Sequence, residues 1–166
     1  MYKRQFLSIE IEIDNNEDHI EFNVNQSLVS VLIETGLWNS FRTRPFNRTP
    51  SLDSLPDAIF VNCCDTNPLS VDPHFIIDVD QDYFDIGLDA VSKEFDCSIY
   101  VSYQNNNFEK INSDVIYNQF SGPHPAGLSG THISKLNPVN LNKVVWTINY
   151  QDIISIGHLI KNKTLR

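Results

Sequence analysis

The chain has 166 residues, of which 41% are hydrophobic, and a formal net charge of −9. This length and apolar content suit one globular domain that buries its own core. The acidic balance and the lack of any large Lys/Arg cluster argue against nucleic acid as a partner. Neither a run of about 18 apolar residues nor a signal-peptide core is present, so we expect a soluble, cytoplasmic protein.

The cysteines and the two ends of the chain carry further information. The three cysteines include the adjacent pair Cys63 and Cys64, and no Cys-x-x-Cys metal pattern occurs. We expect reduced thiols that act as small core residues. The chain starts almost at once with strand-like alternation and stops soon after an apolar helix. We interpret residues 1–166 as one domain excised from a longer protein.

The first elements follow from hydrophobic periodicity. Apolar residues alternate with polar ones from Leu7 to Ile13, which predicts a half-buried strand at a sheet edge or a domain border within residues 1–14. Helical spacing predicts a helix over 27–35, with Gly36 placed where a helix ends in the left-handed conformation.

An aromatic and basic loop is predicted from Leu37 to Phe46. Its two arginines, Arg42 and Arg44, lie among Trp and Phe residues and can bind an anion or stack on a ring. The alternative is that they pair with neighbouring carboxylates and cover the edge of the core.

A continuous apolar run, Ala58 to Val61, predicts a central strand covered on both faces. Asn62, Asp65 and Asn67 follow it directly. Open α/β sheets bind ligands just outside the carboxyl ends of their strands, so these side chains are candidates for a ligand site. The alternative is a turn that satisfies its own backbone through Asx bonds before Pro68.

The rest of the chain alternates between helices and strands. The predicted elements are a helix over 80–95, strands over 98–103 and 115–120, a short helix over 128–136 and a strand over 143–148. A last helix opens at Asn149, with Asp152 completing a pattern like a capping box. This alternation predicts an α/β fold with a largely parallel sheet.

The segment from Phe120 to His132 contains three glycines, two prolines and two histidines. The spacing of His124 and His132 matches no metal motif, so we expect hydrogen-bonded histidines that shape the turn. Neither Ser121 nor Ser129 lies in a Gly-x-Ser-x-Gly elbow. The prolines remove amide donors, which makes the turn a poor phosphate cradle.

Four segments together carry a family resemblance. They are Gly36-Leu37-Trp38 through Phe46, Asp65-Thr66-Asn67-Pro68-Leu69, Gly122 through His132, and Trp146-Thr147-Ile148-Asn149-Tyr150-Gln151-Asp152. In this order they resemble the A subunit of the bacterial Na+-translocating NADH:quinone reductases. The resemblance implies an internal Rossmann-like domain with a mostly parallel sheet and flanking helices.

The same segments resemble altered counterparts of the flavin-binding subunit of respiratory complex I. There the first loop is a glycine-rich flavin cradle, whereas Asn39 to Phe46 contain no glycine here. The bulky Phe41, Arg42, Arg44 and Phe46 would occupy the space that a flavin needs. The resemblance therefore implies a remnant pocket without a flavin.

From the resemblance we expect a non-redox structural and interaction domain, with no cofactor or metal of its own and no catalytic residue. Flavins and an iron-sulfur centre are expected on other subunits, and the membrane-embedded subunits are the expected partners at the cytoplasmic face of the bacterial inner membrane. The alternative is a pocket for quinone or a nucleotide; a hydrolase dependent on His124 is a third hypothesis. The candidate pocket comprises Arg42, Arg44, Phe46, Asn62, Asp65, Asn67, His124, Gly127, Gly130, His132 and Asn149.

Overall fold

The computed structural model describes residues 10, 12, 21–104, 108–110, 112–140 and 142–165. The strand predicted from Leu7 to Ile13 lies outside this part of the chain, apart from Glu10 and Glu12. Within the described ranges, no helix has the length and apolar content needed to cross a membrane.

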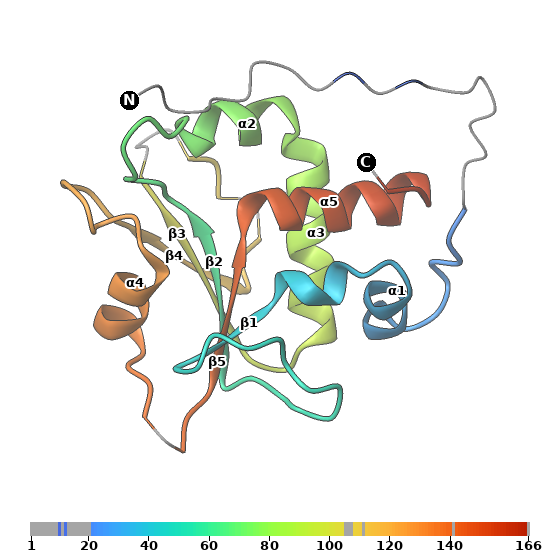
Figure 1. Cartoon of the computed structure of the whole chain (residues 1–166), viewed down its shortest axis with the longest axis horizontal. Coiled ribbons are helices and arrows are strands. Elements are labelled where there is room, and N and C mark those ends of the chain that lie inside the picture. The colour runs from blue at the N-terminus through green and yellow to red at the C-terminus, as the bar shows by residue number, and fades with distance from the viewer. Residues whose placement is uncertain are drawn as a thin grey trace.

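A five-stranded sheet forms the centre of the fold (Figure 1). Its strands are β1 (Arg42–Arg44), β2 (Ala58–Cys63), β3 (Ser98–Tyr103), β4 (Val115–Gln119) and β5 (Val145–Asn149). They lie in the order β1-β5-β2-β3-β4, and all neighbours are parallel except β1, which runs antiparallel to β5 at one edge. The predicted α/β class with a largely parallel sheet is confirmed.

Helices cover both faces of this sheet, unequally. They are α1 (Leu28–Glu34), the 3-10 helix η1 (Leu37–Ser40), α2 (Pro73–Val79), α3 (Gln81–Glu94), α4 (Ser129–Leu136) and α5 (Tyr150–Asn162). In Figure 1, α1, α3 and α5 lie to the right of the sheet and α4 lies to its left. The larger core therefore forms on the side of α3 and α5, and a smaller one forms under α4.

Alternation along β2 divides its side chains between these two cores. Ile59 and Val61 face the larger core, whereas Ala58 and Phe60 face the smaller one, where Ile133 of α4 packs. All four β2 residues are buried, as predicted for a central strand.

Close approach of α3 and α5 depends on two glycines. A Cβ atom at Gly87 would clash with the backbone oxygen of Ile153, and one at Gly157 would clash with that of Tyr83. The absence of side chains at these positions lets the two helices pack backbone to backbone.

The prediction of a loop from Leu37 to Phe46 is wrong, because this segment forms η1 and the edge strand β1. Its aromatic residues are core residues: Trp38 packs edge-on against Trp146 at 5.5 Å, and Phe41 is fully buried against the same ring. The preceding helix ends as predicted, with Gly36 at a φ of 79°.

Two other details differ from expectation. Helix α2 was not predicted, although Asp72 and Pro73 occupy its N-cap and first helical positions. Asn149 occupies the N-cap position of α5, but its side chain makes no capping bond. Asp152 does bond the backbone of Asn149, as the capping-box pattern predicts, and it also accepts a hydrogen bond from Ser40 at 2.9 Å. Burial raises the pKa of its carboxyl group.

Candidate functional site

A pocket of about 690 Å³ opens at the carboxyl ends of β2 and β5. Asn62 and Asn149 are aligned in the register of these two strands. After β2 the chain adds β3 and β4 on one side of β2. It then crosses back to form β5 on the other side of β2. The pocket thus lies where the strand order reverses, which is the usual ligand position in open α/β sheets. Its walls are formed by Arg44, Asn62, Cys64, Asp65, Asn67, Pro125, Gly127, Leu128, Ser129, Gly130, Thr131, Asn149, Tyr150 and Gln151.

The structure brings seven of the eleven candidate residues into this pocket. These are Arg44, Asn62, Asp65, Asn67, Gly127, Gly130 and Asn149. The residues were found because polar side chains that follow a buried strand, and glycines in a turn before a helix, collect at the same edge of a parallel sheet. The other four candidates lie elsewhere.

Arg42 and Phe46 are not among the residues that line the pocket. The Arg42 guanidinium donates to Thr49 Oγ1 at 2.7 Å on the exposed side of β1. The Phe46 side chain is 65% exposed. Of the two predicted arginines, only Arg44 therefore contributes to the pocket wall.

The two histidines serve the turn. His124 is exposed, with Nδ1 at 3.3 Å from Thr66 Oγ1. His132 is buried, with Nε2 at 2.8 Å from the carbonyl oxygen of Ala126 and its ring 4.1 Å from that of Phe120. Burial lowers the pKa of His132, so the ring is neutral and Nε2–H donates to Ala126. The expectation of hydrogen-bonded histidines is confirmed.

Two hydrogen bonds attach the turn to the end of β2. Asn62 Nδ2 donates to the Gly127 carbonyl oxygen at 3.1 Å, and the Gly127 amide donates to Thr66 Oγ1 at 3.0 Å. A Cβ atom at Gly127 would lie 2.7 Å from the Thr66 amide nitrogen. Only glycine permits this approach, so the pocket wall has a fixed shape.

Asp65 and Asn67 form the Asx turn that was one of the two alternatives drawn from the sequence. Asp65 Oδ1 accepts from the amide nitrogen of Asn67 at 2.9 Å and from its side-chain nitrogen at 2.7 Å, which is an Asx turn. Both residues nevertheless line the pocket. The turn therefore holds the Asp65 carboxylate in place at the pocket wall.

Arg44 and Asp65 give the pocket one basic and one acidic wall. Arg44 Nε is buried and makes no hydrogen bond within the described residues. Arg44 and Gly130 also border an apolar recess of about 200 Å³, whose other walls are Pro45, Ile133, Ser134, Pro138 and Val139. A ligand with a polar head and an apolar extension matches this shape.

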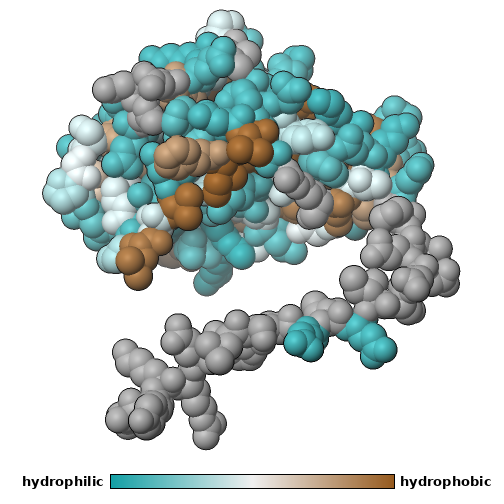
Figure 2. Space-filling model, turned by 90° about the horizontal axis from the view of Figure 1, so that it is seen from above, coloured by the Kyte–Doolittle hydropathy of each residue, from teal (hydrophilic) through white to brown (hydrophobic). Residues whose placement is uncertain are grey.

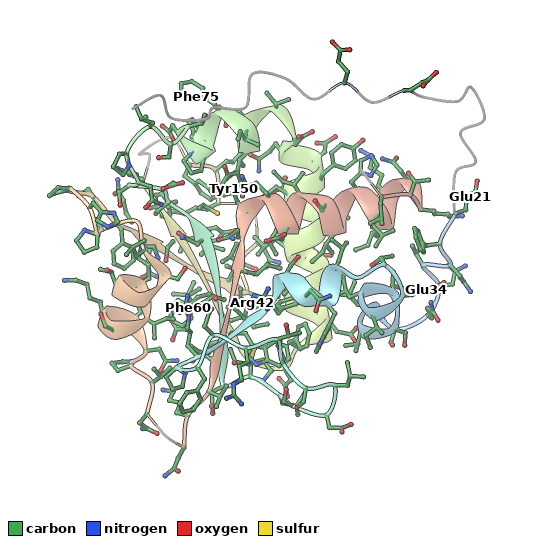
Figure 3. All side chains as sticks on the ribbon, viewed as in Figure 1. Glu21, Glu34, Arg42, Phe60, Phe75 and Tyr150 are labelled. Carbon is green, nitrogen blue, oxygen red and sulfur yellow. The ribbon has the colours of Figure 1, made fainter. Side chains whose placement is uncertain are left out.

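Seven wall residues were not predicted as site residues, among them the two titratable residues Cys64 and Tyr150. Burial and the nearby Asp72 raise the pKa of the Cys64 thiol to about 12. Burial, with a contribution from Asp65, also raises the pKa of Tyr150, which begins α5 (Figure 3). Both groups keep their protons at neutral pH, so the pocket can donate hydrogen bonds but supplies no thiolate nucleophile. Tyr150 lies just beyond the strand predicted over 143–148, and this position was a signal that the sequence offered.

No metal site accompanies the pocket in the described part of the chain, where no three His, Cys, Asp or Glu side chains converge.

The fold and this crevice define the class of the chain: an open α/β domain with a polar pocket at its topological switch point. Residues 24–165 match the family model described as the NqrA second alpha/beta domain, and the chain belongs to this family.

The relatives agree with this assignment. The chain is 40% identical over 178 residues to the A subunit of the Na(+)-translocating NADH-quinone reductase of Rhodopirellula baltica, covering 98% of this chain and 39% of that protein. It is 42% identical to the subunit of the same name from Klebsiella pneumoniae, covering 95% and 38%, and 43% identical to that of Vibrio atlanticus, covering 95% and 37%. The predicted family resemblance is confirmed. The chain spans about two fifths of the length of the curated relatives it matches.

Proposed function

We propose that this chain is one domain of the A subunit of a Na+-translocating NADH:quinone reductase, in which it has a structural and interaction role without a redox step of its own. The observation that carries the proposal is that residues 37–46 form η1 and β1 and contain no glycine-rich loop. The chain is about 40% identical to named A subunits. The fold also descends, in this proposal, from that of the flavin-binding subunit of complex I.

The packing of this segment argues against a flavin. Phe41 is fully buried among Trp38, Phe95 and Trp146, so it cannot move aside for a ligand without opening the core. Arg44 extends into the pocket that a flavin would need. In this segment the backbone therefore cannot approach a flavin ring as closely as a glycine-rich loop can.

The remaining parts of the proposal concern the whole complex. NADH oxidation and quinone reduction are coupled to sodium export, and the flavins and the iron-sulfur centre belong to other subunits. This domain belongs to a peripheral subunit on the cytoplasmic face of the bacterial inner membrane, where it docks on the membrane-embedded subunits. The names of the relatives support this reaction. The relatives are more than twice as long as this chain, which supports a subunit of several domains.

Flavin content tests the non-redox role. The full-length subunit is purified without denaturation and its flavin absorbance is compared with its protein concentration. We expect a flavin content far below one per chain. A stoichiometric flavin that is lost when Phe41 or Arg44 is replaced would refute the proposal.

The pocket supports a second candidate function, the binding of quinone or a nucleotide. Its position at the strand-order reversal and its polar chamber with an apolar recess favour this candidate. Titration with quinone analogues, NADH and FMN, followed by thermal shift, tests it, because a ligand of the native state raises its stability. Arg44→Ala should abolish any shift, and the matched Arg42→Ala, outside the pocket, should not. If no ligand raises the melting temperature, the binding function is refuted and the interaction role is the remaining proposal.

A further inference from the structure

An exposed apolar patch covers α2 and the segment that precedes it. We call Leu69, Val71, Phe75 and Val79 the α2 patch; all four are exposed, Phe75 at 67% and Val79 at 81%. Figure 2 shows a band of hydrophobic side chains on the face seen from above, and in Figure 3 Phe75 points away from the sheet. Phe75 and Val79 are four residues apart in α2 and so share one side of the helix.

The fold does not need these side chains. Pro73 and Ile77 attach α2 to the core, and Asp72 caps the helix by accepting from the amide of His74 at 3.0 Å. Large apolar side chains grouped on a surface commonly mark an interaction site, because covering them removes apolar area from water.

The charges around the patch are mainly of one sign. From residue 69 to residue 82, which covers the patch and the start of α3, the sequence contains four Asp and neither Lys nor Arg. Asp78, in α2, and Asp82, in the next helix, are both exposed. Two basic groups lie near them: His74 Nδ1 is 3.1 Å from an Asp78 oxygen, and Lys161 Nζ is 3.5 Å from an Asp82 oxygen. The patch therefore has an apolar centre and an acidic rim.

This charge pattern selects the occupant. Anionic lipid surfaces attract basic segments and would repel an acidic rim. A second copy would bring two acidic rims together, which like-charge repulsion disfavours. Cytoplasmic loops of membrane proteins carry an excess of Lys and Arg, which complements the rim. We infer that the α2 patch docks a segment of a membrane-embedded partner subunit in which apolar side chains are flanked by Lys and Arg. The inference rests on the proposed function.

The test measures how tightly the full-length subunit binds the detergent-solubilised remaining subunits of the reductase. Phe75→Ser with Val79→Ser removes the centre of the patch, and Leu55→Ser, with a side chain 82% exposed outside the patch, is the matched control. The double variant should bind at least about tenfold more weakly, as loss of an interface anchor does. The control should bind like the wild type. Because the replaced residues are exposed, all variants should keep the wild-type melting temperature.

A second variant tests the rim. Asp78→Asn with Asp82→Asn removes two charges without changing the apolar centre. Binding should weaken several-fold at low salt, and its decrease with added salt should become shallower, because charge complementarity at a rim is screened by ions. Unchanged affinity and salt dependence in this variant would contradict the basic character of the partner.

Other outcomes separate the inference from the proposed function. If the double variant binds as tightly as the wild type, the patch is not the docking surface, although the proposed function stands. If the wild-type subunit itself does not bind the remaining subunits, the proposed function fails. Three results overturn the inference by naming another occupant: patch-dependent binding to phosphatidylserine vesicles, patch-dependent dimerisation, or protection of residues 69–79 from hydrogen exchange in the isolated full-length subunit.

Discussion

Gly127→Ala is expected to loosen the pocket wall. The new Cβ atom would lie 2.7 Å from the Thr66 amide nitrogen and 2.9 Å from Thr66 Oγ1, both closer than normal contacts. The nearest atom is backbone, so the turn or the end of β2 must move. Either movement lengthens the hydrogen bonds that Asn62 and Thr66 make with Gly127.

The cost follows from these contacts. Overpacking in a close-packed site costs about 1–3 kcal/mol. Loss of one of the two hydrogen bonds adds about 1 kcal/mol. We therefore expect Gly127→Ala to lower the free energy of unfolding by about 2–4 kcal/mol. Gly130 borders the same pocket and lies in α4, where a Cβ atom would meet no other atom within 4 Å. Gly130→Ala should therefore be neutral or stabilise by up to about 1 kcal/mol.

Urea denaturation of both variants, followed by circular dichroism, measures this difference, and NMR shifts of residues 62–67 report on the turn contact. Equal free energies of unfolding for the two variants would refute the steric reasoning. A large loss in Gly127→Ala with no shift change at Thr66 would show that the strain lies elsewhere.

Two further predictions concern stability. Gly157→Ala should cost at least about 3 kcal/mol in urea denaturation, because its Cβ would clash with the backbone oxygen of Tyr83 and separate α3 from α5; Ser155→Ala, on the same helix, should cost about 1 kcal/mol or less. A Gly157→Ala variant as stable as Ser155→Ala would contradict this packing. Because the pKa of His132 is lowered in the folded state, the unfolded chain binds more protons below about pH 6.5, and stability should fall as the pH drops from about 7 to about 5. His132→Gln should flatten this part of the stability profile measured by thermal unfolding, and an unchanged slope would show that other groups cause it.

The sequence alone determined the fold class and much of the pocket. Apolar period distinguishes helix from strand locally, so α1, β2, α3, β3, β4, α4, β5 and α5 were all predicted. Asn62, Asp65 and Asn67 were placed correctly at the sheet edge because they directly follow a buried strand. These inferences need only neighbours in the chain.

Only the tertiary structure decided the rest. Strand β1 has three residues and exists through pairing with β5, about 100 residues further along the chain, so no local pattern reveals it. Arg42 and Arg44 share one side of β1, yet a bond to Thr49 holds the first outside the pocket while the second reaches into it. The glycine turn has a fixed place because Gly127 meets Thr66, and such long-range packing is set by the whole fold rather than by the local sequence.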